Sequence, residues 1–474
     1  MLQGPIPSFV FDQVKLTTLL LSSNNLTGVV WTDNFLKLKN LEKLDLSSNS
    51  LSLLNTKANH KNTLLPKLQE VHLRSCGKVE FPNFIRASRY LQELDLSNNS
   101  IQGHVPDWMW DVGRETLVGL DLSYNYLTGR IERIPWKNLY FLDLHSNLLQ
   151  GQLPITPFEL AFFRISANNL TGEIPTSFYN LKRIYFLVIS KNALSGIIPE
   201  CIRNLTYGLQ LLHLQKNSFH GKIPSMSSEY CDLRTLNFNG NQLEGPLPRS
   251  IANCTSLEVL NLGNNVINDT FPHWLHILPE LQLLVLKSNH FRGPILDYKA
   301  HHSFPNLRVF DISNNNFVGP LPMKYIKNMK AMMHVENYSD EVKYIGEPYI
   351  FTEDPVILMI KGLEYELLKI ITNFKVIDLS NNKFEGEVPE VIENLSFLKG
   401  LNFSHNLLSG HIPSSMGNLR ELECNGASLQ SQPLLREEDD YESGFDWNII
   451  MMGYSSGLVM GLSLGYIVFI TGKP

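Results

Sequence analysis

The sequence has few of the features that mark an enzyme or a nucleic-acid-binding protein. It contains no glycine-rich phosphate loop, no H-E-x-x-H, no G-x-S-x-G and no kinase catalytic loop. Only five cysteines occur among 474 residues, and their spacing fits no metal site. The formal net charge is −6 and no basic patch is present, so nucleic acid is not an expected partner. These absences predict a protein that is not an enzyme and that uses no metal or cofactor.

What the sequence does contain is a recurring segment, L-x-x-L-x-L-x-x-N, which runs from Leu16 to Asn406. Fifteen copies occur, most of them 21 to 27 residues apart, with one step of 67 between Asn315 and Asn382. This pattern and period are those of a leucine-rich repeat. The Asn position, once substituted by cysteine, is filled by Asn24, Asn49, Cys76, Asn99, Asn125, Asn147, Asn168, Asn192, Asn217, Asn241, Asn265, Asn289, Asn315, Asn382 and Asn406.

The repeat predicts the fold class directly. The leucines of one copy cannot bury themselves alone, so the copies must stack into a solenoid. The repeated Asn is expected to turn inward and satisfy backbone groups where each strand ends. A G-x-[ILV]-P segment follows many copies, as in Gly103–Pro106 and Gly245–Pro248, and predicts a turn. We therefore predict an α/β-type leucine-rich-repeat solenoid with a curved parallel β-sheet on its concave face. Loops and short 3-10 or α turns are expected on its convex face, and one transmembrane helix near the C-terminus.

An insertion separates the last repeats from the others. Replacing an ordinary step by 67 residues leaves about 43 extra, and such long insertions are often functional. Its tyrosines favour recognition, with Tyr338, Tyr344, Tyr349 and Lys361 as candidate contacts, although a mobile surface loop is the alternative. The predicted organisation is a solenoid at 1–322, an island at 323–373, final repeats at 374–422, an acidic linker at 423–446, a transmembrane helix at 447–470 and a short cytoplasmic end at 471–474.

The concave sheet is a second candidate surface. One strand position reads Gly119, Phe141, Phe162, Phe186 and Leu211 in successive copies, so stacking would line these residues up as an apolar column. An exposed apolar stripe with charges at its edge resembles a peptide-binding face, and partial burial at a strand edge is the alternative. The candidate ligand face comprises Tyr124, Phe141, Asp143, His145, Phe162, Arg164, Phe186 and Lys191.

Covalent modifications can also be predicted. Cys231 and Cys254 precede the strands of adjacent repeats, so they either form a disulfide or remain two small buried side chains. N-x-[ST] sequons predict glycosylation in the secretory pathway. Asn98 is next to one of the repeated Asn positions, which together form a ladder along the solenoid. Asn402 is within a predicted strand, so both are weaker candidates than the rest. The sequons lie at Asn25, Asn98, Asn169, Asn204, Asn253, Asn268, Asn337, Asn394 and Asn402.

The segment from Trp447 to Ile470 carries no charge over 24 residues, enough to cross a bilayer as a helix. Acidic residues precede it and Lys473 follows it, which predicts repeats outside and a C-terminus inside. Four glycines recur every four residues and define a face for helix association, unless they reflect only the abundance of glycine in membrane helices. They are Gly453, Gly457, Gly461 and Gly465.

The motif L-x-x-L-x-L-S-x-N-x-L-x-G-x-I-P resembles the plant-specific class of leucine-rich repeats. Together with the island, the acidic stretch and the segment FDWNIIMMGYSSGLVMGLSLGYIVFITGKP, it resembles plant receptor-like proteins of the Cf/Ve disease-resistance type. The resemblance implies a single-pass plasma-membrane receptor with extracellular repeats and no kinase domain. It implies binding of an extracellular peptide, protein or glycan, often from a pathogen, and signalling through adaptor and co-receptor kinases. A developmental peptide receptor, a secreted enzyme inhibitor and a non-functional fragment are the alternatives.

The chain also departs from that family. It opens on MLQGPIPSF, already within a repeat, and lacks the signal peptide and the cysteine-paired cap that the family has. Two copies follow the island, and the last incomplete one breaks at Glu423. The sequence therefore predicts a product truncated at both ends, and the expected topology is that of the parent protein.

Overall fold

The computed structural model describes most of the chain up to Leu422. Residues Met1–Leu422 form one compact unit, and the second unit, Glu423–Pro474, lies outside the described residues. The described ranges are 1–56, 66–86, 88–206, 208–226, 230–296, 304–334, 343–346, 356–360, 363–367, 370–419 and 421–422. Within them, no helix is both long enough and apolar enough to cross a bilayer, and the predicted span at 447–470 falls outside them.

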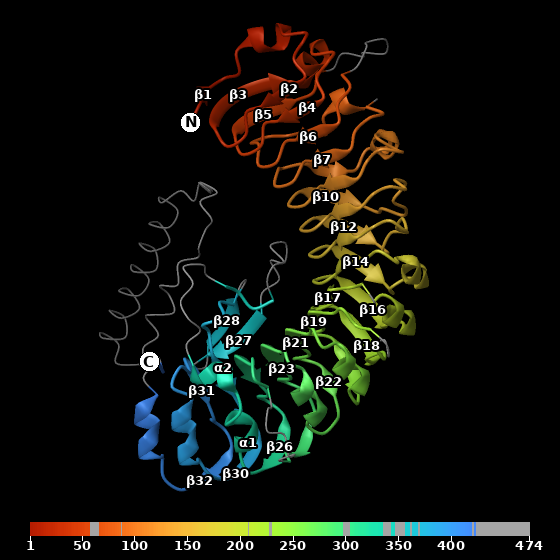
Figure 1. The fold of residues 1–474 in the computed structure, drawn as a ribbon. Helices are drawn as coiled ribbons and strands as arrows, with labels where there is room; N and C mark the ends of the chain where they lie inside the picture. The colour runs from red at the N-terminus through yellow and green to blue at the C-terminus, as the bar shows by residue number, and fades with distance from the viewer. Residues whose placement is uncertain are drawn as a thin grey trace, which may run out of the picture. The chain divides into compact units, whose positions relative to one another are not determined.

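A parallel sheet of fifteen strands runs through the unit in chain order, one strand from each copy of the repeat (Figure 1). Each strand is three residues long, and its middle residue, such as Leu94 or Leu142, is buried in the core in all but the last strand, where Leu401 is half-buried. The strands are β2 (Thr18–Leu20), β4 (Lys43–Asp45), β6 (Glu70–His72), β7 (Glu93–Asp95), β9 (Gly119–Asp121), β11 (Phe141–Asp143), β13 (Phe162–Arg164), β15 (Phe186–Val188), β17 (Leu211–His213), β19 (Thr235–Asn237), β21 (Val259–Asn261), β23 (Leu283–Val285), β25 (Val309–Asp311), β29 (Val376–Asp378) and β31 (Gly400–Asn402).

A second set of parallel strands follows the Asn positions, in sheets of three, eight and four strands. Glycines with positive φ, such as Gly103 at 85°, let the chain turn at these strands. The three-stranded sheet holds β1 (Gln3–Gly4), β3 (Asn25–Trp31) and β5 (Ser50–Leu54). The eight-stranded sheet holds β8 (Gln102–His104), β10 (Tyr126–Gly129), β12 (Leu148–Gly151), β14 (Asn169–Gly172), β16 (Ala193–Ile197), β18 (Ser218–Lys222), β20 (Gln242–Gly245) and β22 (Val266–Ile267). The four-stranded sheet holds β24 (Arg292–Pro294), β26 (Asn316–Gly319), β30 (Lys383–Glu387) and β32 (Leu407–Ser409).

Short 3-10 helices then return the chain to the next copy, and most begin directly after the proline of G-x-[ILV]-P. Pro106, for example, has φ −67° and ψ 144° and precedes η4, as expected for a residue whose ring fixes φ. These helices are η1 (Ser8–Asp12), η2 (Thr32–Lys37), η3 (Asn83–Ile85), η4 (Asp107–Asp111), η5 (Thr176–Asn180), η6 (Glu200–Asn204), η7 (Arg249–Asn253), η8 (His273–Ile277), η9 (Glu390–Asn394) and η10 (Ser414–Asn418).

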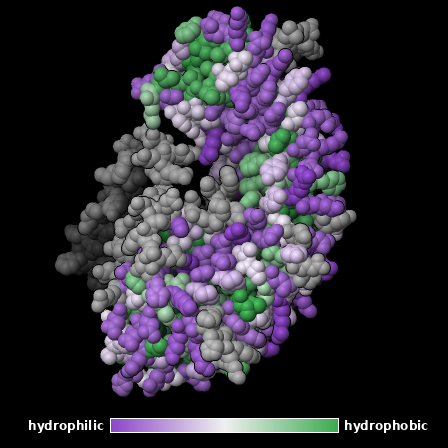
Figure 2. All heavy atoms as spheres, in the orientation of Figure 1, coloured by the Kyte–Doolittle hydropathy of each residue, from purple (hydrophilic) through white to green (hydrophobic). Residues whose placement is uncertain are grey.

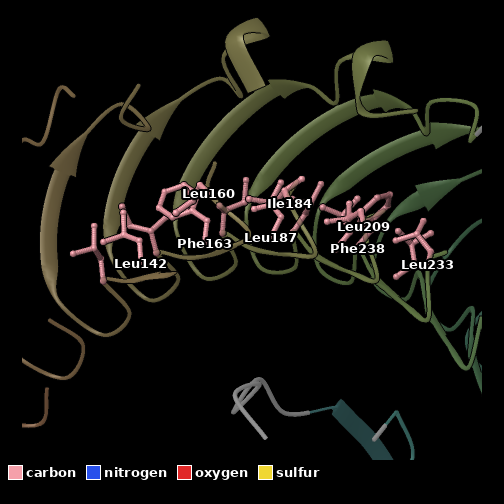
Figure 3. Close-up of a cluster of buried hydrophobic side chains, with 14 of the residues drawn as sticks. Leu142, Leu160, Phe163, Ile184, Leu187, Leu209, Leu233 and Phe238 are labelled. Atoms are coloured by element: carbon pink, nitrogen blue, oxygen red, sulfur yellow. The ribbon is translucent and has the colours of Figure 1, made fainter. Parts of the chain in front are cut away.

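The core is one continuous row of leucine, isoleucine and phenylalanine side chains. Leu142, Phe163 and Leu187 come from successive strands and lie side by side beneath the ribbon (Figure 3). Because each copy contacts its two neighbours, burial is shared along the solenoid rather than concentrated in one centre. Hydrophilic residues cover much of the face in Figure 2, and hydrophobic surface gathers over the first repeats. Exposed apolar residues there include Phe9, Leu20, Val29 and Trp31.

The ladder Asn residues join neighbouring copies through their side chains. The Nδ2 of Asn125 donates to the carbonyl of Leu96 in the preceding copy at 2.9 Å, and to Leu122 and Ser123 in its own. Its Oδ1 accepts from the backbone N–H of Ile101 at 3.0 Å. One buried amide therefore satisfies groups from two copies, because it carries both donors and an acceptor.

The residue before each ladder position adopts a left-handed backbone, and it is usually not glycine. Tyr124 has φ 53° and Lys191 has φ 50°, a region that costs free energy for residues with a Cβ. In most copies the ladder amide donates to the two carbonyls just before this residue, as Asn125 does to Leu122 and Ser123. The left-handed backbone recurs in every copy, including that of Ser75 before Cys76.

Cys76 fills a ladder position with a thiol. Its Sγ donates to the carbonyl of Leu46 in the preceding copy at 3.2 Å, and burial raises the pKa of the thiol to about 12. The thiol supplies one donor but not the amide oxygen that accepts a backbone N–H in other copies, such as that of Leu26 on Asn49 at 3.0 Å.

The first part of the island packs as part of the solenoid. Helix α1 (Met323–Ile326) follows Pro322, and Tyr325 is buried against Phe271 and Phe304, with ring centroids 5.5 and 5.8 Å away. Helix α2 (Lys330–Met333) buries Met332 in the same core. These residues occupy the return segment of their own repeat, so the chain leaves the solenoid only after α2.

The remainder of the described island is an antiparallel hairpin, β27 (Val356–Ile360) with β28 (Leu363–Leu367), and a bridge between Tyr344 and Ile371. The ladder continues across this insertion. The Oδ1 of Asn382 accepts from the N–H of Phe317 at 3.1 Å, and its Nδ2 donates to the carbonyl of Ile312 at 3.0 Å.

Candidate ligand-binding face

The apolar column expected from the sequence forms on the outward face of the fifteen-stranded sheet. Phe141, Phe162 and Phe186 occupy the first position of β11, β13 and β15 and are in register with one another. The rings of Phe141 and Phe162 stack with centroids 4.5 Å apart, and those of Phe162 and Phe186 are 5.7 Å apart. Gly119 precedes the column and Leu211 follows it.

The column is more enclosed than an exposed stripe. Phe162 is only 6% exposed, and Phe141 and Phe186 are half-buried. The exposed aromatic residues are instead Tyr140 and Tyr185, at 48% and 39%, each directly before a column phenylalanine. The repeat period could have predicted this second row, because the position before the column reads Tyr140, Ala161 and Tyr185 in three successive copies. These two tyrosines are not among the residues predicted for the ligand face.

A row of polar side chains lies beside the column, at the third strand position. Asp95, Asp121, Asp143 and Arg164 are in register on four adjacent strands. One oxygen of each of the first two carboxylates accepts from a serine two residues later, as Asp121 Oδ1 does from the N–H of Ser123 at 2.9 Å. These bonds account for the recurrence of Asp at this position, because they close the turn after the strand.

The neighbouring carboxylates of this row change one another's pKa. Burial, reinforced by the neighbouring charges of Asp143 and Asp95, raises the pKa of Asp121 to about 8. Burial also raises the pKa of Asp143 to about 6, against the lowering effect of Arg164. Desolvation and like charge both disfavour the ionised form of a carboxyl group. This part of the row therefore changes charge between mildly acidic and mildly basic pH.

Arg164 ends the acidic row and is incompletely paired. Its Nη1 lies 3.5 Å from Asp143 Oδ2, and both side chains are about 5% exposed. Its Nε and Nη2 are buried and have no hydrogen-bond acceptor in the described structure. Leaving a buried donor unsatisfied costs roughly 1–3 kcal/mol, and more for a charged group. A buried guanidinium with two unused donors therefore calls for an explanation.

The other residues of the predicted face lie around this pair. The Nδ1 of His145 is 2.6 Å from the Oγ of Ser166, and its ring meets the edge of Tyr124 with centroids 5.1 Å apart. Tyr124 and Lys191 occupy the left-handed turn before their ladder Asn. The structure thus brings Tyr124, Phe141, Asp143, His145, Phe162 and Arg164 together on adjacent strands, with Phe186 and Lys191 one strand beyond.

Further along the sheet, the outward face is buried. Arg234 pairs with Glu258 at 2.9 Å, and burial raises the pKa of Glu258 although Arg234 lowers it. A side chain at island residue Gly346 would meet Val259 at 3.4 Å and Thr235 at 3.6 Å, so the island lies against this part of the sheet. The buried outward residues are Leu211, Thr235, Val259, Leu283, Val309 and Val376.

Among the candidate island contacts, Tyr344 is described and is half-buried beside Ile371. Lys375, two residues after the island, donates from Nζ to the carbonyl of the island residue His334 at 2.8 Å. The other candidates, Tyr338, Tyr349 and Lys361, lie outside the described residues, as do Gly453, Gly457, Gly461 and Gly465.

Most predicted sequons are on surfaces other than this face. Exposed sequon asparagines lie in second-set strands, in 3-10 helices or beside them, and none of them is in the fifteen-stranded sheet. They are Asn25, Asn169, Asn204, Asn253, Asn268 and Asn394. Asn98 and Asn402 are half-buried, and their Nδ2 atoms donate to Ser75 and Asp378 respectively. Asn337 lies outside the described residues.

The described residues include one disulfide and two free cysteines. Cys231 and Cys254 form a disulfide, whereas Cys76 is a buried thiol and Cys201 a half-buried one. Over the described ranges, no group of three or more His, Cys, Asp or Glu side chains is placed to hold a metal ion.

Comparison with known proteins places this architecture in a class. Sequence descriptions of the leucine-rich repeat match residues 231–291, and also 90–112, 306–325, 373–395 and 397–432. The fold resembles that in the crystal structure of PEPR1–AtPEP1 (TM-score 0.66, 26% identity, 88% of this chain and 52% of that chain). It also resembles the Arabidopsis receptor kinase HAESA in complex with the peptide hormone IDA and the co-receptor SERK1 (TM-score 0.67, 26% identity, 89% and 67%). The protein is therefore a plant-type leucine-rich-repeat solenoid.

Curated relatives narrow the class. Receptor-like protein 32 of Arabidopsis thaliana is 40% identical over 360 residues, covering 75% of this chain and 39% of the relative. Receptor-like protein 53 of Arabidopsis thaliana is 39% identical over 397 residues, covering 82% of this chain and 38% of the relative. The chain belongs to the plant leucine-rich-repeat receptor-like proteins. It spans about two fifths of the length of these two relatives.

Proposed function

We propose that this chain is the ligand-sensing part of a cell-surface receptor, and that it binds an extracellular peptide on the outward face of β9 to β17. The observation that carries the proposal is the stacked column of Phe141, Phe162 and Phe186 beside the buried Asp143–Arg164 pair. Aromatic side chains next to a few fixed polar groups are typical of binding sites, because the rings supply area and the polar groups fix orientation.

The distribution of predicted glycans supports the same face. Because the exposed sequons lie away from the fifteen-stranded sheet, glycans attached there would not cover the outward face of the sheet. The exposed rings of Tyr140 and Tyr185 beside the aromatic column would stay accessible to a ligand. The island against β19 and β21 would bound the ligand at one end.

We further propose that residues 447–470 anchor the protein in the plasma membrane, with the repeats outside. Gly453, Gly457, Gly461 and Gly465 would let the helix of a partner receptor kinase approach closely. In this proposal the partner kinase carries the signal into the cell. A disease-resistance role, with a pathogen-derived ligand, is the form of the proposal that the family resemblance favours.

An endogenous ligand is the second candidate function. HAESA was solved with a peptide hormone and a co-receptor, and that likeness favours a developmental peptide receptor of the same build. The two forms share the site and differ only in the source of the peptide.

The test is ligand-dependent association in plant tissue. The full chain would be expressed with an affinity tag, treated with pathogen culture filtrate or with the plant's own secreted peptides, and tested for co-precipitation of receptor kinases. We expect association that follows one treatment, and loss of it in Phe162→Ser. Phe9→Ala is the matched control, because Phe9 is 63% exposed on η1, outside the fifteen-stranded sheet. Association independent of treatment, or unchanged by Phe162→Ser, contradicts the proposal.

A further inference from the structure

Two exposed tyrosines lie in one row, directly before the strands β11 and β15. Backbone hydrogen bonds join this row from copy to copy: the N–H of Ala161 donates to the carbonyl of Tyr140 at 2.9 Å, and that of Tyr185 to Ala161 at 2.8 Å. Ala161 is buried and offers only a methyl group, whereas Val118 precedes Tyr140 in the row and Gln210 follows Tyr185. This part of the row therefore presents two rings, separated by one small residue.

The spacing of the two rings follows from the sheet. Adjacent strands lie about 4.8 Å apart, so equivalent positions two strands apart are separated by about 9.5 Å. A fully extended peptide laid across the strands repeats its side chains on one face about every 6.7 Å, and two turns of an α-helix rise about 10.8 Å. Three residues of a polyproline II helix rise about 9.3 Å. Of these regular conformations, polyproline II matches the interval between Tyr140 and Tyr185 best.

Tyrosine also suits this conformation chemically. The flat ring packs against the pyrrolidine ring of a proline, and the hydroxyl can donate to a backbone carbonyl of the peptide. A polyproline II segment makes no internal hydrogen bonds, so its carbonyls are available as acceptors. Aromatic side chains are used in this way by surfaces that bind P-x-x-P segments. Tyr140 and Tyr185 are both exposed, so a ligand can reach their rings.

A carboxylate lies toward one end of the ring pair. Glu93 occupies the first position of β7, and its side chain is 55% exposed. The first position of the next strand, β9, is Gly119, so no side chain at that position separates Glu93 from β11. The Oε2 of Glu93 is 3.6 Å from Nε2 of His72, which lies on β6, on the opposite side from β9. A cationic side chain of a ligand over Tyr140 would therefore find an exposed carboxylate on the β7 side.

We propose that Tyr140, Tyr185 and Glu93 form a subsite for a proline-rich peptide in the polyproline II conformation. Two prolines three residues apart pack on the two rings, and an arginine or lysine lies toward Glu93. The rings alone accept the segment in either direction, and the carboxylate selects the direction that places the basic residue over β7 and β9. The inference rests on the proposed function, because it names the class of peptide to which the receptor's ligand belongs.

The experiment uses the full chain and a synthetic peptide, acetyl-Arg-Ala-Ala-Pro-Ala-Ala-Pro-Ala-amide. A second peptide of the same composition, acetyl-Arg-Ala-Ala-Pro-Ala-Pro-Ala-Ala-amide, changes only the interval between the prolines, and a third carries Glu in place of Arg. Each is also made in reverse order, and the direction that binds better is compared. By titration calorimetry, we expect the first to bind about tenfold more tightly than the second or the third.

Substitutions assign the effect to the tyrosines. Tyr140→Ala and Tyr185→Ala should each weaken binding of the first peptide about tenfold. Tyr126→Ala is the matched control, because Tyr126 is exposed on β10, outside the fifteen-stranded sheet, and should change nothing. When the proline farther from Arg is replaced by alanine, binding should become insensitive to Tyr185→Ala and stay sensitive to Tyr140→Ala.

The charge has its own pair of variants. Glu93→Gln should remove the preference for the Arg peptide over the Glu peptide. Glu244→Gln should keep that preference, because Glu244 is exposed on β20, in the eight-stranded sheet.

Equal binding of the two proline intervals overturns the inference, and so does an affinity that either tyrosine substitution leaves unchanged or that Tyr126→Ala lowers as much. An Arg preference that persists in Glu93→Gln overturns it as well, and so does the absence of binding by any peptide. None of these results depends on kinase association, so the subsite can fail while the proposed receptor function stands, and the reverse.

Discussion

Replacing Cys76 by asparagine should stabilise the protein. In the neighbouring copy, Asn49 donates to the carbonyls of Leu21, Leu46 and Ser47 at 2.9, 3.0 and 3.1 Å, and accepts from the N–H of Leu26 at 3.0 Å. Cys76 makes one comparable bond, from Sγ to Leu46 at 3.2 Å, and a weak one to Arg74 at 3.8 Å. Asparagine would add an acceptor and strengthen the donors, with little change in side-chain volume.

The expected gain follows from the number of bonds. Each intramolecular hydrogen bond contributes about 0.5–1.5 kcal/mol net, so two additional bonds should stabilise by roughly 1–3 kcal/mol. The assay is equilibrium unfolding of the full chain in urea under reducing conditions. Cys76→Asn should raise the midpoint without changing the slope, which reports the surface exposed on unfolding.

Two further variants make the reasoning refutable. Asn49→Cys should lose a similar amount, because it removes the same bonds from the preceding copy. Cys201→Asn should gain nothing, because Cys201 is half-buried outside the ladder. An unchanged or lower midpoint for Cys76→Asn, in a chain that tolerates Asn49→Cys, would refute the account of the ladder.

Other measurable consequences follow from the same structure. Replacing both Cys231 and Cys254 by serine should cost roughly 3 kcal/mol of unfolding free energy under oxidising conditions, because the disulfide closes a loop across 23 positions; an equal loss in reducing buffer would contradict this. Asp121 has its pKa raised from 3.8 to about 8, so the unfolded chain loses its proton first and stability should fall as pH rises between these values. Asp121→Asn should therefore flatten the pH dependence of the urea midpoint, and an unchanged slope would exclude this carboxyl as its source. Mass spectrometry of protein secreted from plant cells should find glycans at Asn169 and Asn204, which are exposed, and little at Asn98 or Asn402, whose amide nitrogens are bonded; full occupancy of the last two would show that these bonds open during synthesis.

The strands and the ladder could be predicted from the sequence because one physical constraint repeats in every copy. Leu94 and Asn99 belong to a pattern in which each leucine must face the core and each Asn must close a turn. The same period placed Phe141, Phe162 and Phe186 in one column, since residues at equal positions of stacked strands are neighbours.

Properties that depend on single departures from the pattern could not be predicted this way. The repeat period predicts that Val188 lies next to Arg164 on the following strand. It does not predict that two donors of Arg164 are left without an acceptor there. Likewise, the sequence shows where the series of Asn positions is interrupted, but it does not show that α1 and α2 pack into the core. Tyr325 and Met332 do not occupy positions of the L-x-x-L-x-L-x-x-N motif.

The ladder across the insertion also bears on how such proteins diversify. Asn382 joins Phe317 and Ile312 over 65 and 70 positions of chain, with the same bonds that Asn125 makes over 24 and 29 positions. Closing a flexible loop costs only about 0.6 kcal/mol more for each doubling of its length. A change in the length of the segment between α2 and β29 should therefore cost the scaffold little free energy, so this point of the solenoid can accept insertions that the flanking repeats cannot.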